Sequence, residues 1–205
     1  EPFIVQNIGD RISRKKQVKK LLEIVGLPAR SASRYPFEFS GGQRQRIGIA
    51  RSIALNPKLV ICDEPVSALD VSIQSQILNL LIDLQKEFKL SYLFIAHDLA
   101  VVKHISDRIA IMYLGKVAES SAGEIVYHNP RHPYTQSLIS AIPIPDPHQV
   151  TERLVISGDV PSPIDPPSGC RFHPRCPQVM DRCKHELPQL RSIDDGHLVS
   201  CHQGD

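Results

Sequence analysis

The sequence predicts an α/β fold built on a parallel sheet, and three observations support this. Two short apolar runs, Leu59–Cys62 and Ser91–Ala96, lack polar alternation and suit strands buried on both faces. Between these runs, apolar residues recur at helical spacing over 73–88 and define an amphipathic helix. A third apolar run, Arg108–Leu114, follows after a short helix, so the order is that of a parallel α/β sheet.

The other helices and strands expected before residue 128 are indicated by helical spacing and by glycine and proline residues that end them. Helical spacing over 17–25 ends at Gly26, and a second helix over 41–55 is stopped by Asn56 and Pro57. Gly115 turns the third strand into a short fourth one over 116–120. We therefore expect helices before the first strand and a strand pair after the third.

The character of the chain changes after Tyr127. One helical run, 135–142, lies between prolines, and the stretch 143–188 is rich in proline with little periodicity. We place a domain boundary near residue 128, with one domain over 1–128 and an irregular extension rich in proline and cysteine over 129–205.

Composition excludes several classes of protein. Hydrophobic residues make up 41%, charged residues 22%, and the formal net charge is +2, as in an ordinary globular protein. No run approaches the ~18 apolar residues of a membrane-spanning helix, and no signal-peptide pattern opens the sequence. The basic residues between Arg14 and Lys20 indicate a solvated helix face rather than a nucleic-acid site. Because the sequence starts at Glu1 in apparent mid-domain material, we expect a fragment.

The segment Ser40-Gly41-Gly42-Gln43 has the pattern of a helix start that holds an anion. Serine is a good N-cap, and two glycines allow a phosphate to approach the exposed backbone N–H groups. The alternative is a plain capped helix. The acid-ended strand about twenty residues later favours the phosphate interpretation.

Three polar residues follow the ends of the first two predicted strands. Asp63 and Glu64 end the first, and His97 follows the second, so all three are expected at the carboxyl edge where ligands gather. An aspartate there can hold Mg²⁺ through water, and the next carboxylate can orient an attacking water. The alternatives are an acidic turn and a structural histidine. Asp70 is equally well explained as the N-cap of the helix that follows.

Together these residues resemble the ABC-type ATPase family of P-loop NTPases. FSGGQ (39–43) is similar to its signature motif, LVICDE (59–64) to its Walker B strand and catalytic glutamate, SALD (67–70) to its D-loop, and His97 to its switch histidine. The resemblance implies two ATPase domains closing head to tail on two ATP molecules. Glu64 would polarise the attacking water, with His97 beside it, while Asp63 would support Mg²⁺. Residues 40–43 would contact the partner's nucleotide, and Asp70 would act across the interface.

The same resemblance exposes a gap. No G-x-x-x-x-G-K-[ST] motif occurs in the 205 residues, so the Walker A loop that cradles phosphates is missing. We therefore expect the chain to carry half of an ATP site, beginning inside the helical subdomain.

Four late cysteines, Cys170, Cys176, Cys183 and Cys201, suggest a metal site. Five cysteines without a secretory signal argue against a disulfide framework. The paired C-x₂-C knuckles that are typical of zinc ribbons do not occur in this sequence. Four thiolates suit an iron–sulfur cluster. The structural alternative is that the thiols bind no metal. The surrounding sequence resembles the C-terminal extension of oligopeptide/dipeptide importer ATPases, which implies a [4Fe–4S] cluster. Zn²⁺ remains the other candidate, with His173, His185 or His202 as substitute ligands.

The resemblance implies an ATP-binding and ATP-hydrolysing subunit of a di- or oligopeptide importer, peripheral on the cytoplasmic face of the membrane. Its partners would be a second ATPase subunit, identical or different, the transmembrane permease subunits and, indirectly, a peptide-binding protein. One rival is an inactive fragment that supplies only the signature half-site. The other is a soluble ABC-type ATPase acting on nucleic acid or ribosomes, which the lack of a basic stripe argues against.

Overall fold

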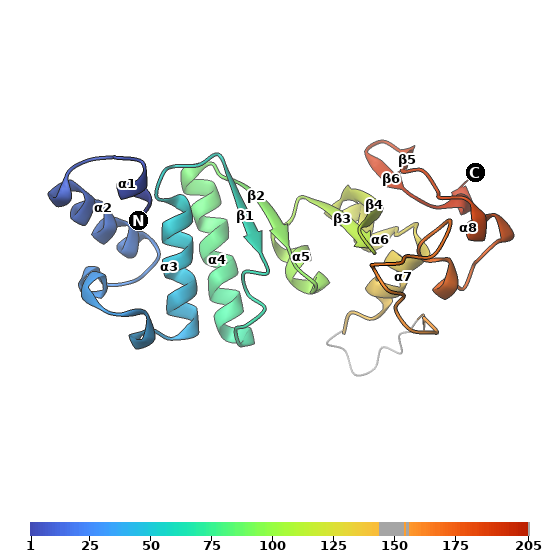
Figure 1. Ribbon diagram of the computed structural model, residues 1–205, viewed down its shortest axis with the longest axis horizontal. Coiled ribbons are helices and arrows are strands. Elements are labelled where there is room, and N and C mark those ends of the chain that lie inside the picture. Colours follow the sequence, from blue (N-terminus) through green and yellow to red (C-terminus); the bar gives the residue numbers. More distant parts are fainter. Residues whose placement is uncertain (144–153, 155, 205) are drawn as a thin grey trace. The chain divides into compact units, whose positions relative to one another are not determined.

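The computed structural model describes residues 1–143, 154 and 156–204 and divides the chain into two units, Glu1–His97 and Asp98–Asp205. Figure 1 shows the first unit in blue to green and the second in green to red. The division follows the packing and differs from the boundary near residue 128, which stays a prediction.

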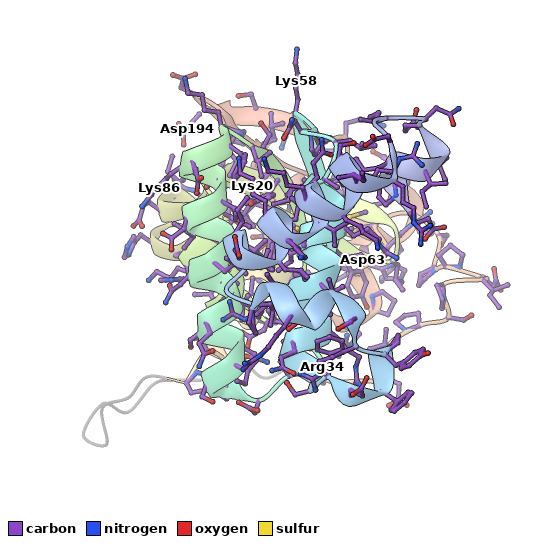
Figure 2. All side chains as sticks on the ribbon, turned by 90° about the vertical axis from the view of Figure 1, so that its left-hand side faces the viewer. Lys20, Arg34, Lys58, Asp63, Lys86 and Asp194 are labelled. Atoms are coloured by element: carbon purple, nitrogen blue, oxygen red, sulfur yellow. The ribbon has the colours of Figure 1, made fainter. Side chains whose placement is uncertain are left out.

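The first unit consists of helices and one small sheet. Its elements in chain order are α1 (Pro2–Val5), α2 (Arg11–Ile24), η1 (Ala29–Ser33), η2 (Pro36–Glu38), α3 (Gly41–Ile53), β1 (Leu59–Asp63), α4 (Val71–Phe88) and β2 (Ser91–Ile95). The predicted helices and the first two strands are confirmed, although α2 begins six residues earlier than expected. Lys15 to Lys20 on α2 are exposed, as a solvated face requires, and Figure 2 marks Lys20.

Helix α4 organises this unit because its apolar stripe is long and well capped. Asp70 caps its N-terminus, and Lys89, with φ +53°, ends it in the left-handed conformation. Its buried residues recur at three- and four-residue spacing: Ile77, Leu78, Leu80, Leu81 and Leu84. Helices α3 and α4 lie side by side in Figure 1, and Arg46 of α3 ties them together by donating to the side chain of Gln76.

Strands β1 and β2 pair in parallel, with Leu59 opposite Ser91 and Asp63 opposite Ile95. The prediction that both strands are buried on both faces is wrong for the described chain. Val60 and Cys62 are buried, but Leu59 and Ile61 are 54% and 63% exposed, and Leu93 and Ile95 of β2 are 51% and 45% exposed. One apolar face of this parallel sheet therefore lies open, although such sheets are ordinarily covered on both sides.

The second unit is built on an antiparallel sheet of order β3-β4-β6-β5. Its elements are α5 (Leu99–Ile105), β3 (Arg108–Tyr113), β4 (Lys116–Ala122), α6 (Gly123–His128), α7 (Pro133–Ser140), η3 (His173–Arg175), α8 (Asp181–His185), β5 (Arg191–Asp194), β6 (His197–Val199) and η4 (His202–Gly204). The expectation that the third strand extends the parallel sheet is wrong, because β3 pairs with β4 instead. The hairpin β5–β6 also joins this sheet, so the extension is more regular than its sequence suggests.

Phe172 forms the aromatic centre of the second unit. Its side chain is 2% exposed, and its ring lies within 5.2–5.8 Å of the rings of Tyr113, Tyr134 and His132. Burial lowers the pKa of His132 to about 4, so its ring is neutral at pH 7. The Nδ1 atom of His132 accepts from the backbone N–H of Tyr134, which caps α7.

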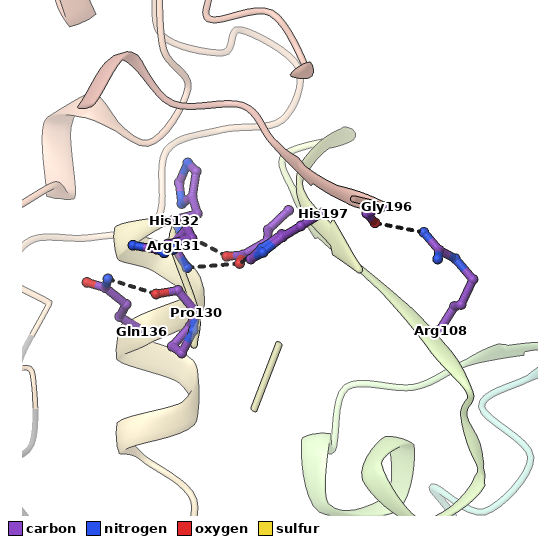
Figure 3. A network of polar contacts seen from close by, with 8 residues as sticks. Arg108, Pro130, Arg131, His132, Gln136, Gly196 and His197 are labelled. Atoms are coloured by element: carbon purple, nitrogen blue, oxygen red, sulfur yellow. Dashed lines mark hydrogen bonds and ion pairs between the residues drawn. The ribbon is translucent and has the colours of Figure 1, made fainter. Parts of the chain in front are cut away.

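A fully buried carboxylate connects three segments of the same unit (Figure 3). Glu119 of β4 accepts from the backbone N–H groups of Arg131 and His132 at 2.9 Å, and its Oε1 lies 2.7 Å from Nε2 of His197 on β6. At the edge of the network, Arg108 donates to the carbonyl of Gly196 at 3.1 Å. Glu119 thus joins β4, the start of α7 and the C-terminal hairpin.

Gly169 carries a steric requirement that a substitution can test. Its φ is +62°, and a Cβ built there would lie 2.5 Å from the carbonyl oxygen of Cys183. We expect Gly169→Ala to lower the free energy of unfolding of the second unit by about 2–4 kcal/mol, because backbone atoms would have to move.

Gly158→Ala is the matched control. Gly158 has φ +83° but open space around its Cα, so alanine there meets only backbone strain of about 1 kcal/mol. Urea unfolding followed by circular dichroism measures both variants. Equal losses would show that the close approach to Cys183 is not a constraint.

Candidate functional site

Glu64 and His97 meet at the carboxyl edge of the β1–β2 pair. Oε1 of Glu64 lies 3.1 Å from Nδ1 of His97, and the two side chains are 47% and 71% exposed. The parallel register places the residues that follow Asp63 and Ile95 next to each other, which explains a contact across 33 positions of sequence. The expected juxtaposition of these two residues is present.

The backbone of Glu64 adopts a conformation that non-glycine residues rarely take. Its φ is +44°, in the left-handed region, while its N–H donates to the carbonyl of Ile95 at 3.0 Å. Ser67 donates from its hydroxyl to the carbonyl of Glu64 at 3.2 Å. Strained backbone held from both sides is common where a side chain must be aimed, here toward His97.

Asp63 ends β1 immediately before this turn, and its side chain is exposed. Figure 2 labels Asp63 and also Lys58, which projects from the chain just before β1. Two adjacent exposed carboxylates are oxygen ligands of the kind that Mg²⁺ takes together with water and substrate phosphates. The donor set therefore fits magnesium, and Asp63 is the residue that would hold it.

The predicted phosphate-binding helix start forms a complete capping box. Ser40 Oγ accepts from the N–H of Gln43 at 3.3 Å, and Oε1 of Gln43 accepts from the N–H of Ser40 at 3.1 Å. Phe39, buried beneath the guanidinium of Arg34 at 4.6 Å, anchors the preceding residue. Gly41 and Gly42 are the first two residues of α3, so their N–H groups have no partner inside the helix.

The two glycines also have a packing role that the sequence analysis missed. A Cβ on Gly42 would lie 2.6 Å from Cγ2 of Ile73, and one on Gly41 would lie 3.4 Å from Cδ2 of Leu69. The signature segment therefore lies against the 67–70 segment and the first turn of α4 in the same chain.

Asp70 is the N-cap of α4, the structural alternative considered for it. Its Oδ1 accepts from the Ser72 hydroxyl at 2.7 Å and from the N–H of Ile73 at 3.0 Å, and these bonds lower the pKa of Asp70. Gln74 was missed by the sequence analysis. Its Nε2 donates to the carbonyls of Val66 and Leu69, both at 3.1 Å, and so fixes the loop that leads into α4.

The signature residues 40–43 and the residues at the carboxyl edge of β1 and β2 form two separate sets of contacts. Within the part of the chain that the structure describes, no hydrogen bond or ion pair links residues 40–43 with Asp63, Glu64 or His97. The assignment of residues 40–43 to the nucleotide of a second domain stays a prediction of the resemblance.

The four late cysteines share the second unit. The N–H of Cys170 donates to the carbonyl of Cys183 at 2.8 Å. Burial, then the neighbouring thiols of Cys201, Cys170 and Cys183, raise the pKa of Cys176 to about 11. Yet among the described residues no three Cys, His, Asp or Glu side chains are arranged to hold a metal ion. The thiols are near one another but not in ligand positions, so the predicted cluster is not supported by this arrangement. Cys62 is buried in β1, as predicted.

Comparison with known families matches two separate stretches of the chain. Residues 3–67 match the family described as "ABC transporter", and residues 118–183 match "Oligopeptide/dipeptide transporter, C-terminal region". No helix of the described residues is long and apolar enough to cross a membrane.

Two relatives from Bacillus subtilis (strain 168) are similar over 98% of this chain. They are an "Oligopeptide transport ATP-binding protein AppF", 53% identical over 204 residues, and a "Putative oligopeptide transport ATP-binding protein YkfD", 54% identical over 205 residues. The chain spans about 62% of the length of each.

A solved structure supports the fold. The ADP conformation of MJ1267, an ATP-binding cassette of an ABC transporter, superposes with a TM-score of 0.55 over 62% of this chain and 51% of its own, at 24% identity. This structure shows the fold, and the family match over residues 3–67 together with the relatives indicates the class, that of ABC transporter ATP-binding proteins. The chain is similar to the oligopeptide/dipeptide transporter C-terminal region over residues 118–183 and to oligopeptide transport ATP-binding proteins over 98% of its length.

Gly42 gives a test of the packing between the signature segment and α4. We expect Gly42→Ala to lower the free energy of unfolding by about 1–3 kcal/mol, because the new methyl group overlaps Ile73. Adding Ile73→Ala removes the overlapping atom and should leave the double variant more stable than the two separate losses predict.

Gly48→Ala serves as the control on the same helix. Nothing lies within 4 Å of a Cβ built there, so alanine should stabilise α3 by about 0.5–1 kcal/mol through helix propensity. Chemical denaturation of the unsubstituted chain, the three single variants and the double variant gives the comparison. A neutral or stabilising Gly42→Ala would contradict the packing role.

Proposed function

We propose that this chain is part of an ATP-hydrolysing subunit that drives import of di- or oligopeptides. The observation that carries this is the Glu64–His97 contact at the carboxyl edge of β1 and β2, in a chain that is similar to oligopeptide transport ATP-binding proteins over 98% of its length. It would act as a peripheral subunit on the cytoplasmic face of the membrane, with a second ATPase subunit, permease subunits and an external peptide-binding protein.

In this proposal Glu64 and His97 prepare the attack of water on ATP. The carboxylate of Glu64 accepts a hydrogen bond from the water and so orients it. The His97 ring donates from Nδ1 to the Glu64 carboxylate and so holds that carboxylate in position. When bound through Asp63, Mg²⁺ supplies charge neutralisation on the phosphates.

The start of α3 would serve a nucleotide held by a second subunit. The N–H groups of Gly41 and Gly42 point out of a helix N-terminus, where the helix dipole favours negative charge. The capping box occupies Ser40 Oγ as an acceptor only, so its O–H remains able to donate to phosphate. Asp70, bound to α4, would hold the 67–70 segment in shape at the interface rather than bind nucleotide itself.

A segment with a phosphate loop is the missing part of this design. The 205 residues contain no such loop, and the apolar face of β1 and β2 that carries Ile61 and Leu93 is open. We propose that a segment bearing the loop covers this face. The inactive half-site remains the rival, and it predicts that the chain binds phosphate only through residues 40–43.

We expect the 205-residue chain alone to bind ATP weakly and not to hydrolyse it, because no loop cradles the phosphates. We then consider a chimera in which the AppF segment that precedes the matched stretch is fused in front of residue 1. This chimera should hydrolyse ATP. In that chimera, Glu64→Gln should lower kcat by about 10²–10⁴-fold, as expected for loss of a group that handles the water's proton. Phosphate release measures both proteins.

Glu124→Gln is the control, because it makes the same substitution in a Glu–His pair outside the proposed site. Glu124 and His128 of α6 form another exposed Glu–His pair, at 3.2 Å, and replacing that glutamate should leave turnover unchanged. Turnover by the 205-residue chain alone, abolished by Glu64→Gln, would contradict the need for a supplied loop. A chimera indifferent to Glu64→Gln would contradict the role of Glu64.

We also propose that Cys170, Cys176, Cys183 and Cys201 hold a [4Fe–4S] cluster. The proposal starts from the presence of the four cysteines in one unit and from the hydrogen bond that the backbone N–H of Cys170 donates to the carbonyl of Cys183. Ligation would require the side chains to rotate from their present positions, and no step of ATP hydrolysis depends on the cluster.

Anaerobic purification should yield a brown protein with iron and sulfide in equal amounts. Cys176→Ser should remove the colour, whereas Cys62→Ala, at a buried position of β1 in the other unit, should keep it. Colourless protein with one zinc per chain would instead identify the zinc alternative.

A further inference from the structure

The layer between the β3-β4-β6 sheet and α7 is unusually polar for a buried surface. Glu119 and Ser121 of β4 are fully buried on one face of the strand, and His197 of β6 is 1% exposed. Their neighbours across the β3–β4 ladder are Ile111 and Ile109, both buried. Polar groups in such surroundings are costly unless every one of them is hydrogen-bonded.

Three polar atoms of this unit are buried without a partner among the described residues. They are Oγ of Ser121, Oγ1 of Thr135 and Nδ1 of His197. Thr135 lies in the first turn of α7, the helix whose start is bound by Glu119 and which contacts β4. One unpaired buried atom is tolerable, but three in neighbouring elements call for a physical explanation.

The strand register brings two of these atoms together. In the antiparallel β4–β6 ladder Glu119 pairs with Val199 and Ser120 with Leu198, so the same register sets Ser121 opposite His197. Side chains directly opposite each other have Cβ atoms about 5 Å apart and share a face of the sheet. Among the described residues, no direct hydrogen bond joins the Ser121 hydroxyl to Nδ1 of His197.

The chemistry of the His197 ring determines what the missing partner must be. Its Nε2 lies 2.7 Å from the Glu119 carboxylate (Figure 3), which can only accept, so the ring proton is assigned to Nε2 and Nδ1 is left as an acceptor that needs a donor. The hydroxyls of Ser121 and Thr135 are donors that need an acceptor. A molecule that donates once and accepts twice satisfies all three, and water does this.

We propose that one water molecule is bound in this layer between β4, β6 and α7. It donates to Nδ1 of His197 and accepts from the hydroxyls of Ser121 and Thr135. Three hydrogen bonds is the usual number for a buried water. The water completes the Glu119–His197 network and so helps to hold the C-terminal hairpin on the sheet.

Two single substitutions test the proposal by the sign of their effect. If the water is bound, Ser121→Ala and Thr135→Val each remove one of its partners, and the unfolding equilibrium constant should rise about five- to tenfold. Because both hydroxyls bind one water, the effects should not be additive in the double variant. If the layer is dry, each substitution removes an unsatisfied polar atom and should stabilise the protein.

Ser137→Ala is the control in the same helix. Its hydroxyl donates directly to the carbonyl of Pro133 at 3.0 Å. The change in unfolding free energy caused by Ser137→Ala should therefore simply add to the change caused by Ser121→Ala. A crystal structure of the 205-residue chain at about 1.5 Å resolution should show density within 3.2 Å of all three atoms. An empty site there, or stabilisation by either substitution, would overturn the proposal.

Discussion

The parallel pairing of β1 with β2 is the interaction on which the proposed catalytic site depends. It places the turn at Glu64 beside the end of β2, where the N–H of Glu64 bonds to Ile95 and its carboxylate reaches His97. Helix α4 is tied to this pair by a hydrogen bond that the hydroxyl of Tyr92 on β2 donates to the carbonyl of Leu81 at 2.9 Å. Strands β1 and β2 are only five residues each, so such a tie adds to the support that the short ladder gives.

Capping interactions fix where two helices of the first unit begin. Ser40 with Gln43 defines where α3 begins, and Asp70 defines where α4 begins. Gly42 lets these two helix starts approach each other closely. The residues that resemble a nucleotide-binding motif are therefore also the residues that fix local geometry. The proposed nucleotide contact and the packing against α4 involve the same segment, so a substitution there would affect both.

The second unit depends on a different principle. Its sheet is antiparallel, and a buried carboxylate rather than an apolar stripe connects β4, α7 and the C-terminal hairpin. Glu119 can be buried there because two backbone N–H groups and His197 surround it, which offsets the cost of desolvation. This arrangement also brings the segments that carry the late cysteines into one unit, although it does not place their thiols as metal ligands.

The sequence by itself determined the elements of the first unit, their order and the residues at the edge of the sheet. Helical periodicity, caps and the carboxyl-edge rule act over short distances and can be read locally. The sequence could not show that one face of β1 and β2 is open, that β3 leaves the parallel sheet, or that Gln74 and Glu119 have structural roles. Those features depend on which segments meet in space, because coverage of a sheet and partners for a buried charge come from residues far away in the chain. The packing of Gly42 against Ile73 was likewise decided only by the tertiary structure.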